Sequence, residues 1–173
     1  MLYAETLKLV SRLPERRPAA TLPSRLDELF DRLLACPGPA EAVPIENAIW
    51  NAWMYDSHEG AELALDRATS DIAAQRYDIA ETRLARLVRA RPDFSEAWNK
   101  RATLFYILER DEESLADIYR TLALEPRHFG ALCGLGEICL ERGDRDGALL
   151  AFRAALRVNP HLAGIAETCA RLG

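Results

Sequence analysis

The hydrophobic residues in the C-terminal two thirds of the chain recur at intervals of three and four positions, which is typical of amphipathic helices. Three of these apolar runs end just before a proline, at Pro92, Pro126 and Pro160, and the three prolines lie 34 residues apart. Proline ends a helix because it lacks an N–H group and disfavours the helical conformation of the preceding residue. The pattern therefore predicts an all-α fold built from a repeated unit.

Each unit contains two apolar runs separated by a short polar turn, so we predict three helical hairpins. The predicted helix pairs cover residues 61–74 with 77–90, 95–108 with 112–124, and 129–142 with 145–158. The repeats by period are 61–94, 95–128 and 129–162, with the recognisable pattern over 61–160. Residues 161–173 are expected to form a shorter helix that caps the apolar end of the stack.

The stretch LCGLGEICLERGD, residues 132–144, combines three glycines with two cysteines. A phosphate-binding loop would need a strand before it, which the helical pattern does not supply. Cys133 and Cys139 would point about 120° apart on a helix, so they cannot bind one metal ion. We interpret Gly136 as a close contact between two helices, and Gly143 as a left-handed residue just past a helix end.

This pattern resembles the tetratricopeptide repeat family, whose 34-residue motif carries Trp-x-x-Leu-Gly-x-x-Tyr, then Ala-x-x-x-Phe, then Pro. In the third repeat the matching residues are Leu132, Leu135, Gly136, Cys139, Ala148, Phe152, Ala155 and Pro160. The second repeat departs from the motif at Arg101, Ser114 and Thr121, and the first helix of the first repeat matches least well. Segments 27–53, 97–106 and 114–132 are also similar to small alphaproteobacterial members of the family, some of which are exported.

The N-terminal third is less regular. We expect an N-terminal segment over residues 1–23, with a loose helix in 1–13 and a proline-rich linker in 14–23. Residues 24–60 are predicted to form a divergent helical hairpin, capped by Ser24 and with its second helix starting at Pro44. Trp50 and Trp53 would then occupy the packing positions of a second repeat helix, which makes this hairpin a candidate fourth repeat.

Composition excludes several classes of function. The formal net charge of −5 gives no overall basic surface, so nucleic acid is not an expected partner. No apolar run approaches the roughly 20 residues that span a bilayer, which predicts a soluble protein without membrane insertion. Residues 1–13 fail as a secretory signal, which favours the cytoplasm, with the periplasm as the alternative if the native N-terminus differs.

No catalytic or cofactor-binding pattern is present. The three histidines, His58, His128 and His161, are isolated in the sequence, and neither a metalloprotease motif nor a nucleophile elbow occurs. The four cysteines are widely spread, which favours reduced structural thiols. We therefore predict a protein that is not an enzyme and that uses no cofactor or metal.

The family resemblance implies a binding surface. In tetratricopeptide proteins the first helix of each repeat lines a concave groove. Carried onto this chain, the groove positions are Glu62, Leu65, Thr69, Ile72, Glu96, Asn99, Thr103, Tyr106, Gly130, Cys133, Glu137 and Leu140. Asn99 is the first candidate, because an amide can both donate to and accept from a peptide backbone. Leu65 and Thr69 disfavour the carboxylate clamp of chaperone-binding members, which has a cation and an Asn there.

The expected function is that of an adaptor or assembly factor that binds a peptide or protein segment in this groove. The alternative is a structural subunit of a larger complex or homo-oligomer, which would use convex and end surfaces. Two charged stretches bear on the choice, namely the arginines of residues 76–91 and the acidic run 109–113. We interpret both as solvated helix faces, and the alternative is that they contact a partner or a second copy.

Overall fold

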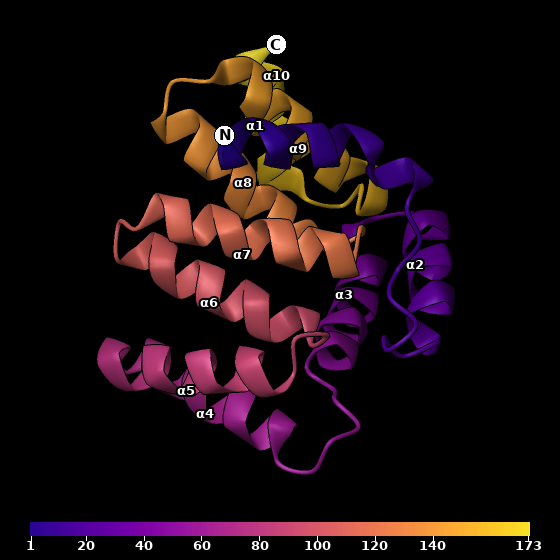
Figure 1. Cartoon of the computed structure of the whole chain (residues 1–173). Coiled ribbons are helices and arrows are strands. Elements are labelled where there is room, and N and C mark those ends of the chain that lie inside the picture. Colours follow the sequence, from indigo (N-terminus) through magenta and orange to yellow (C-terminus); the bar gives the residue numbers. More distant parts are fainter.

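The computed structural model describes residues 1–173 and confirms the all-α fold, with ten α-helices and one short 3-10 helix (Figure 1). The elements are α1 (Leu2–Arg12), η1 (Leu13–Glu15), α2 (Arg25–Ala35), α3 (Pro39–Trp53), α4 (Ala61–Ala73), α5 (Tyr77–Ala90), α6 (Ser95–Ile107), α7 (Asp111–Leu124), α8 (Phe129–Glu141), α9 (Arg145–Val158) and α10 (Ala163–Leu172). No helix is both long enough and apolar enough to cross a membrane.

The six helices from α4 to α9 form three antiparallel hairpins that stack on one another (Figure 1). Each helix begins and ends within one residue of its predicted range. Inside each hairpin the two helices meet at a small buried residue, which is Ala68, Ala102 or Gly136. At Gly136 the approach is closest, because a Cβ atom there would lie 2.2 Å from Cε1 of Phe152 on α9.

The turn inside each hairpin has the same left-handed residue at its centre. Gly143 has a φ of 72°, and its counterparts in the two earlier repeats are Gln75 at 58° and Glu109 at 57°. The next residue closes the turn by donating its N–H to a carbonyl five residues back, as Arg110 does to Phe105 at 2.9 Å. Only the third repeat uses glycine, the residue that adopts this conformation without steric cost.

Replacing Glu109 with glycine is therefore expected to stabilise the protein by about 1 kcal/mol, because the left-handed strain is removed. Thermal unfolding followed by circular dichroism should show a midpoint raised by roughly 2–4 °C. Gly143→Ala is the matched reverse change, and its midpoint should fall. A lower midpoint for Glu109→Gly would contradict this account of the turn.

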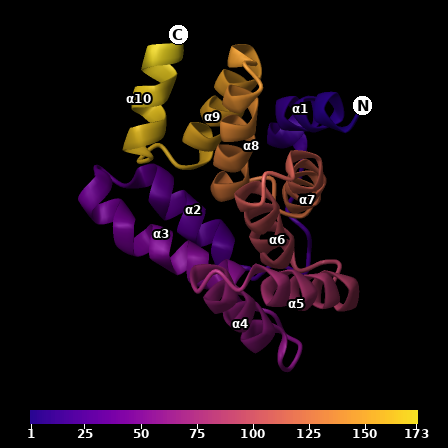
Figure 2. The same cartoon turned by 90° about the vertical axis from the view of Figure 1, so that its left-hand side faces the viewer.

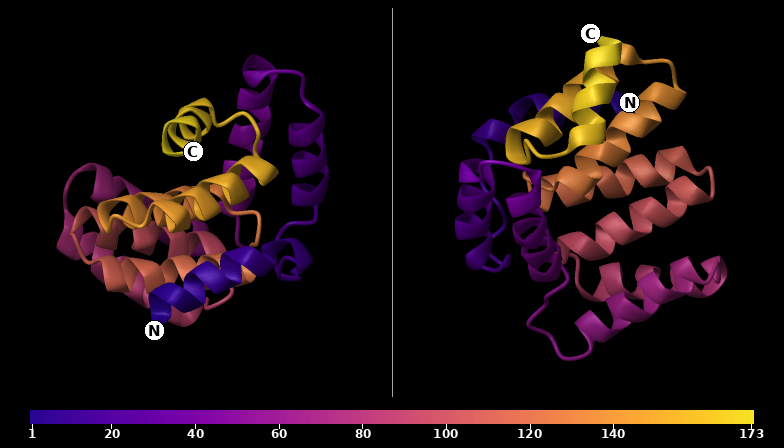
Figure 3. Two further views of the ribbon diagram at one scale, coloured as in Figure 1. Left: turned by 90° about the horizontal axis from the view of Figure 1, so that it is seen from above. Right: turned by 180° about the vertical axis from the view of Figure 1, so that it is seen from behind.

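The hairpin α2–α3 exists, but it lies elsewhere than a fourth repeat would. It packs beside the stack, across the starts of α6 and α8, and does not cover the free face of α4 (Figure 3). Its second helix begins at Pro39 and not at Pro44, which is a correction: Pro44 lies inside α3, on its exposed side. The Ser24 side chain forms no cap bond, although α2 starts directly after it.

The N-terminal helix is an integral part of the core, not a loose segment. It lies on the outer side of the stack against α7 and α9, and buries Thr6, Leu9 and Val10 (Figure 1). The hydroxyl of Tyr3 donates to Asp144 Oδ2 at 2.5 Å, which ties α1 to the start of α9. The linker then runs past the end of α7, where the N–H of Ala19 donates to the carbonyl of Leu124 at 2.7 Å.

The last helix, α10, packs on α9 at the far end of the stack (Figure 2). Four residues of its expected apolar face contact the core: Leu162, Ile165, Cys169 and Leu172. The fifth, Ala166, is exposed, so the predicted face is too wide by one position. No residue of α10 is fully buried, as expected for a capping helix with a polar outer side.

Candidate functional site

The first helices of the repeats, α4, α6 and α8, carry all of the predicted groove residues, but the structure divides these residues into two groups. Nine are exposed or partly exposed: Glu62, Thr69, Ile72, Thr103, Tyr106, Gly130, Cys133, Glu137 and Leu140. Three are buried, namely Leu65 and Glu96, which are inaccessible, and Asn99, which is 7% exposed. Leu65 belongs to the core between α4 and α5.

Glu96 is the centre of a buried polar cluster. Its carboxylate accepts hydrogen bonds from Nε2 of His128 at 2.7 Å and from the amide of Asn99 at 3.2 Å, and it pairs with Lys100 at 3.2 Å. Nδ1 of His128 accepts the N–H of Ala131, so Nε2 carries the ring proton that is donated to Glu96. Burial alone would raise the pKa of Glu96, but the contacts with His128 and Lys100 outweigh burial and lower this pKa below its usual value, so the carboxylate stays ionised.

Asn99 is part of this cluster. Its amide nitrogen donates to Glu96, and Asn99 also lines the hollow between α6 and α8. A buried carboxylate needs such donors, because leaving it unpaired would cost several kcal/mol. Asn99 therefore satisfies Glu96, and its role as a peptide-binding amide stays a prediction.

Helix α3 covers the part of the predicted groove that lies at the starts of α6 and α8. The indole of Trp53 stacks on His128, with 4.0 Å between ring centroids and an angle of 11°, and its N–H donates to Glu125 Oε2 at 3.4 Å. Trp50 lies against Gly130, where a Cβ atom would come within 2.6 Å of the indole. Lys100 lies over the ring of Trp50 at 5.6 Å. The starts of α6 and α8 are thus occupied by the chain itself.

The sequence analysis did not predict that α3 packs over the starts of α6 and α8. The signals that could have found it are the tryptophan pair on one face of α3 and the side-chain-free Gly130 at a groove position. Aromatic side chains supply large buried areas, and a glycine opposite them leaves room for a ring. Packing of the Trp50 side of α3 against Gly130 on α8 accounts for both features.

The second half of the groove stays open. A hollow of about 140 Å³ lies between α6 and α8, with Thr103 and Tyr106 on one side and Gly130 and Gly134 on the other. The Tyr106 hydroxyl donates to Glu141 Oε1 at 2.6 Å, and this bond together with burial raises the pKa of Tyr106 to about 12. Glu137 is exposed on the same side of α8. The rim of the hollow is therefore acidic.

Cys133 is predicted to face the groove and is half-buried in the structure. Burial raises its pKa to about 12, with the nearby Glu137 carboxylate adding to the effect. A thiol with such a pKa stays protonated near neutral pH and is a poor nucleophile. The geometry therefore supports a packing role for this cysteine.

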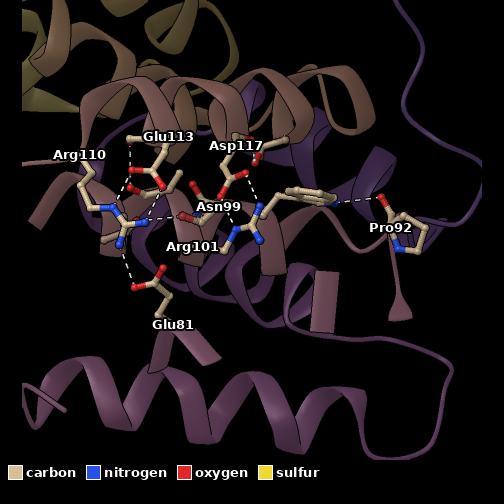
Figure 4. Close-up of polar contacts among 12 residues, drawn as sticks. Glu81, Pro92, Asn99, Arg101, Arg110, Glu113 and Asp117 are labelled. Carbon is tan, nitrogen blue, oxygen red and sulfur yellow. Dashed lines mark hydrogen bonds and ion pairs between the residues drawn. The ribbon is translucent and has the colours of Figure 1, made fainter. Parts of the chain in front are cut away.

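Ion pairs replace part of the usual apolar packing in the second repeat (Figure 4). Arg101 stands where the motif has Leu, and it binds both oxygens of Asp117 at 2.6 and 2.8 Å. Arg110 contacts Glu113 at 2.5 Å and Glu81 of the preceding hairpin at 2.8 Å. In the acidic run 109–113, Glu113 is thus paired with Arg110, and Glu112 is paired with Arg142 at 2.9 Å. At Asp117 burial has the largest effect and raises the pKa of that carboxyl.

Comparisons with known proteins agree with this architecture. The tetratricopeptide repeat family model matches residues 65–124 and 112–163. A TPR repeat-containing protein of Rhizobium etli is 34% identical over 147 residues, which cover 84% of this chain and 72% of that protein. The solved structure of a MamA mutant covers 84% of this chain and 82% of its own, with a TM-score of 0.55 and 17% identity, and shows the fold alone.

The match to the family model spans all three repeats, and the similar protein from Rhizobium etli also bears out the predicted resemblance to alphaproteobacterial proteins. Repeats of this kind support a general role in protein interaction or scaffolding. The chain belongs to the tetratricopeptide repeat family.

Proposed function

We propose that this protein is an adaptor or assembly factor that binds a segment of another protein on the open half of its concave surface. The observation that carries the proposal is the division of the groove. Helix α3 fills the half at the starts of α6 and α8, whereas the hollow beside Thr103 and Tyr106 has no occupant from the chain. Extended concave surfaces are what helical solenoids use for binding.

The chemistry of the open half favours a particular kind of guest. The hollow of about 140 Å³ has room for one aliphatic side chain beside Gly134. Glu137 and Glu141 on the adjacent face of α8 favour a cation close to that side chain. The guest would thus be a segment with a small apolar residue next to Lys or Arg.

Thr103→Arg tests this proposal, because it places a long cation at the edge of the hollow. Thr103 is exposed, and its hydroxyl only donates to the carbonyl of Asn99 one turn back, so the fold should survive. In a pull-down from cells that express the protein, we expect the variant to recover at least tenfold less of the bound partner than the wild type does. Circular dichroism should show unchanged helix content.

Thr82→Arg is the matched control. Thr82 is also an exposed helical threonine, on α5, and donates to the carbonyl of Asp78 at 2.9 Å, but it lies on the opposite side of the stack. The control variant should retain the partner. Equal recovery of the same partners by wild type and Thr103→Arg would refute the concave site.

One observation favours the alternative of a structural subunit. Leu63 on α4 is 52% exposed, whereas its counterparts Ala97 and Ala131 are buried under the preceding hairpin. No hairpin precedes α4 in the stack, so this end is open to another protein. Oligomeric state measured by sedimentation separates the alternatives, since a structural subunit would self-associate through such an end.

A further inference from the structure

A second hollow, of about 440 Å³, lies away from the concave groove, between the start of α4 and the end of α5. Its apolar base consists of Ala64, Leu87 and Ala90. Three arginines surround this base, Arg83, Arg86 and Arg91, against a single carboxylate, Glu59. The site is therefore apolar at its base and cationic at its rim.

The repeat symmetry explains why this hollow exists. Ala64 occupies the position that holds Trp98 in the second repeat and Leu132 in the third. The Trp98 indole fills its own site: it donates to the carbonyl of Pro92 at 3.0 Å and lies 4.9 Å from the guanidinium of Arg101 (Figure 4). Leu132 is fully buried. The first repeat lacks a large side chain at this position, which leaves the space open.

The third repeat shows a chain segment docked at the corresponding place. A hollow there is lined by Pro126, Arg127, Ala154 and Val158, which are the repeat counterparts of His58, Glu59, Arg86 and Ala90. The N-terminal segment contributes Leu13, Pro14, Arg16 and Pro18 to its wall, and Leu13 is only 6% exposed. This position of the repeat can therefore accept an apolar side chain from a segment outside the stack.

The first-repeat hollow carries its arginines at different positions from the third-repeat hollow, which is lined by Arg16, Arg127 and Arg157. Arg83 and Arg86 stand where the third repeat has Ala151 and Ala154. Arg83 is held by Asp71 at 2.8 Å, and Arg91 is held by Asp56 and Asp93, each at 3.2 Å, with its Nη1 buried. Arg86 is exposed and forms no salt bridge in the chain. The donors of Arg86 are thus available to a carboxylate on a guest.

We propose that this hollow is a second protein-docking site, which binds a segment carrying one large apolar anchor, such as Trp or Leu, flanked by carboxylates. The anchor would fill the space over Ala64 that Trp98 fills in the next repeat. A flanking carboxylate would pair with Arg86. The site differs from the concave groove in its position and in the sign of its charge, since this hollow is cationic and the groove rim is acidic.

The test uses the full chain and three short synthetic peptides, with binding measured by isothermal titration calorimetry. The first peptide has a central Trp flanked by Glu, the second has Lys in place of each Glu, and the third has Ala in place of Trp. We expect the first to bind at least tenfold more tightly than the other two. Its affinity should also weaken as salt rises, because the arginine contacts are screened.

Two variants locate the binding. Ala64→Trp fills the hollow as Trp98 does, and Arg86→Glu reverses an exposed charge that the fold does not use. Each variant should bind the Glu-flanked peptide at least tenfold more weakly than the wild type does. Thr103→Arg, in the concave groove, should leave its affinity unchanged, which separates failure at this site from failure of the groove. If Ala64→Trp lowers helix content, its loss of binding could reflect misfolding, and the result for Arg86→Glu then decides whether the peptide binds in this hollow.

Several results would overturn the proposal. These are absence of binding by the Glu-flanked peptide at millimolar concentration, equal binding of the Lys-flanked peptide, or full affinity in Arg86→Glu. Self-association of the chain alone that Ala64→Trp abolishes would instead identify the occupant as a second copy.

Discussion

Replacing Trp53 with alanine is expected to lower the free energy of unfolding by about 3–5 kcal/mol, the usual cost of removing a buried tryptophan. Trp53 is only 1% exposed and lies within 6.0 Å, centroid to centroid, of Phe30, Trp50, His128 and Phe129. It is thus the main contact between α3 and the start of α8. Urea unfolding followed by circular dichroism gives the change in free energy.

Trp98→Ala is the control for this change, because it removes the same side chain from a partly exposed site on α6. Trp98 contributes one hydrogen bond and stacking by Arg101, but no aromatic cluster surrounds it. Its replacement should therefore cost less than that of Trp53. A Trp98→Ala variant as unstable as Trp53→Ala would contradict the central role given to the contact between α3 and α8.

The Trp53→Ala variant should also undock the hairpin locally. The chain on either side, at residues 16–24 and 54–60, holds few helical residues and would become more accessible to proteases once α2–α3 is loosened. Limited proteolysis below the unfolding midpoint should cut these segments faster than in the Trp98→Ala variant. Wild-type cleavage rates in Trp53→Ala would show that other contacts suffice to hold the hairpin.

The repeat helices were predictable because their structure depends on nearby residues. The 34-residue spacing of Pro92, Pro126 and Pro160 and the apolar periodicity between them define each hairpin, since a helix buries its apolar stripe against its own partner helix. Gly136 and Gly143 follow from the same local geometry. Boundaries in this part were therefore accurate to one residue.

The position of α2–α3 was not predictable in this way. Trp50 and Trp53 form an apolar face, but such a face looks the same whether it packs on α4 or across α8. Its partners, His128 and Phe129, lie more than 70 residues away in sequence, and no period links the two segments. Long-range docking of this kind leaves only indirect signs, such as the glycine at position 130.

The assignment of groove residues was limited for the same reason. The resemblance placed Glu96 and Asn99 on the concave face, which is where helix α6 carries them, but it could not show that α3 covers that half. A Glu that is fully buried needs donors, and His128 supplies one from 32 residues away. Helix α3 does not reach the later turns of α6 and α8. The predicted groove residues there, Thr103, Tyr106 and Glu137, are therefore exposed or partly exposed.

The replacement of Gly136 by alanine is expected to destabilise the protein by about 1–3 kcal/mol, which is the usual cost of an overpacked core. A methyl group at this position would lie 2.2 to 2.6 Å from three ring carbons of Phe152, and both residues are fully enclosed. Either the ring must leave its site or α8 and α9 must separate. We expect the thermal midpoint to fall by roughly 2–4 °C for each kcal/mol lost.

Gly134→Ala makes the same chemical change two residues earlier on α8, with the opposite expected sign. There the new methyl group would lie 3.8 Å from Cδ1 of Ile118, an ordinary contact distance, and alanine favours a helix over glycine by about 1 kcal/mol. The midpoint of Gly134→Ala should therefore rise. Because both variants gain the same helix propensity, the difference between them isolates the cost of separating α8 from α9. Equal midpoints would mean that Phe152 moves aside freely, and the close approach at Gly136 would then contribute nothing to the stability of the repeat.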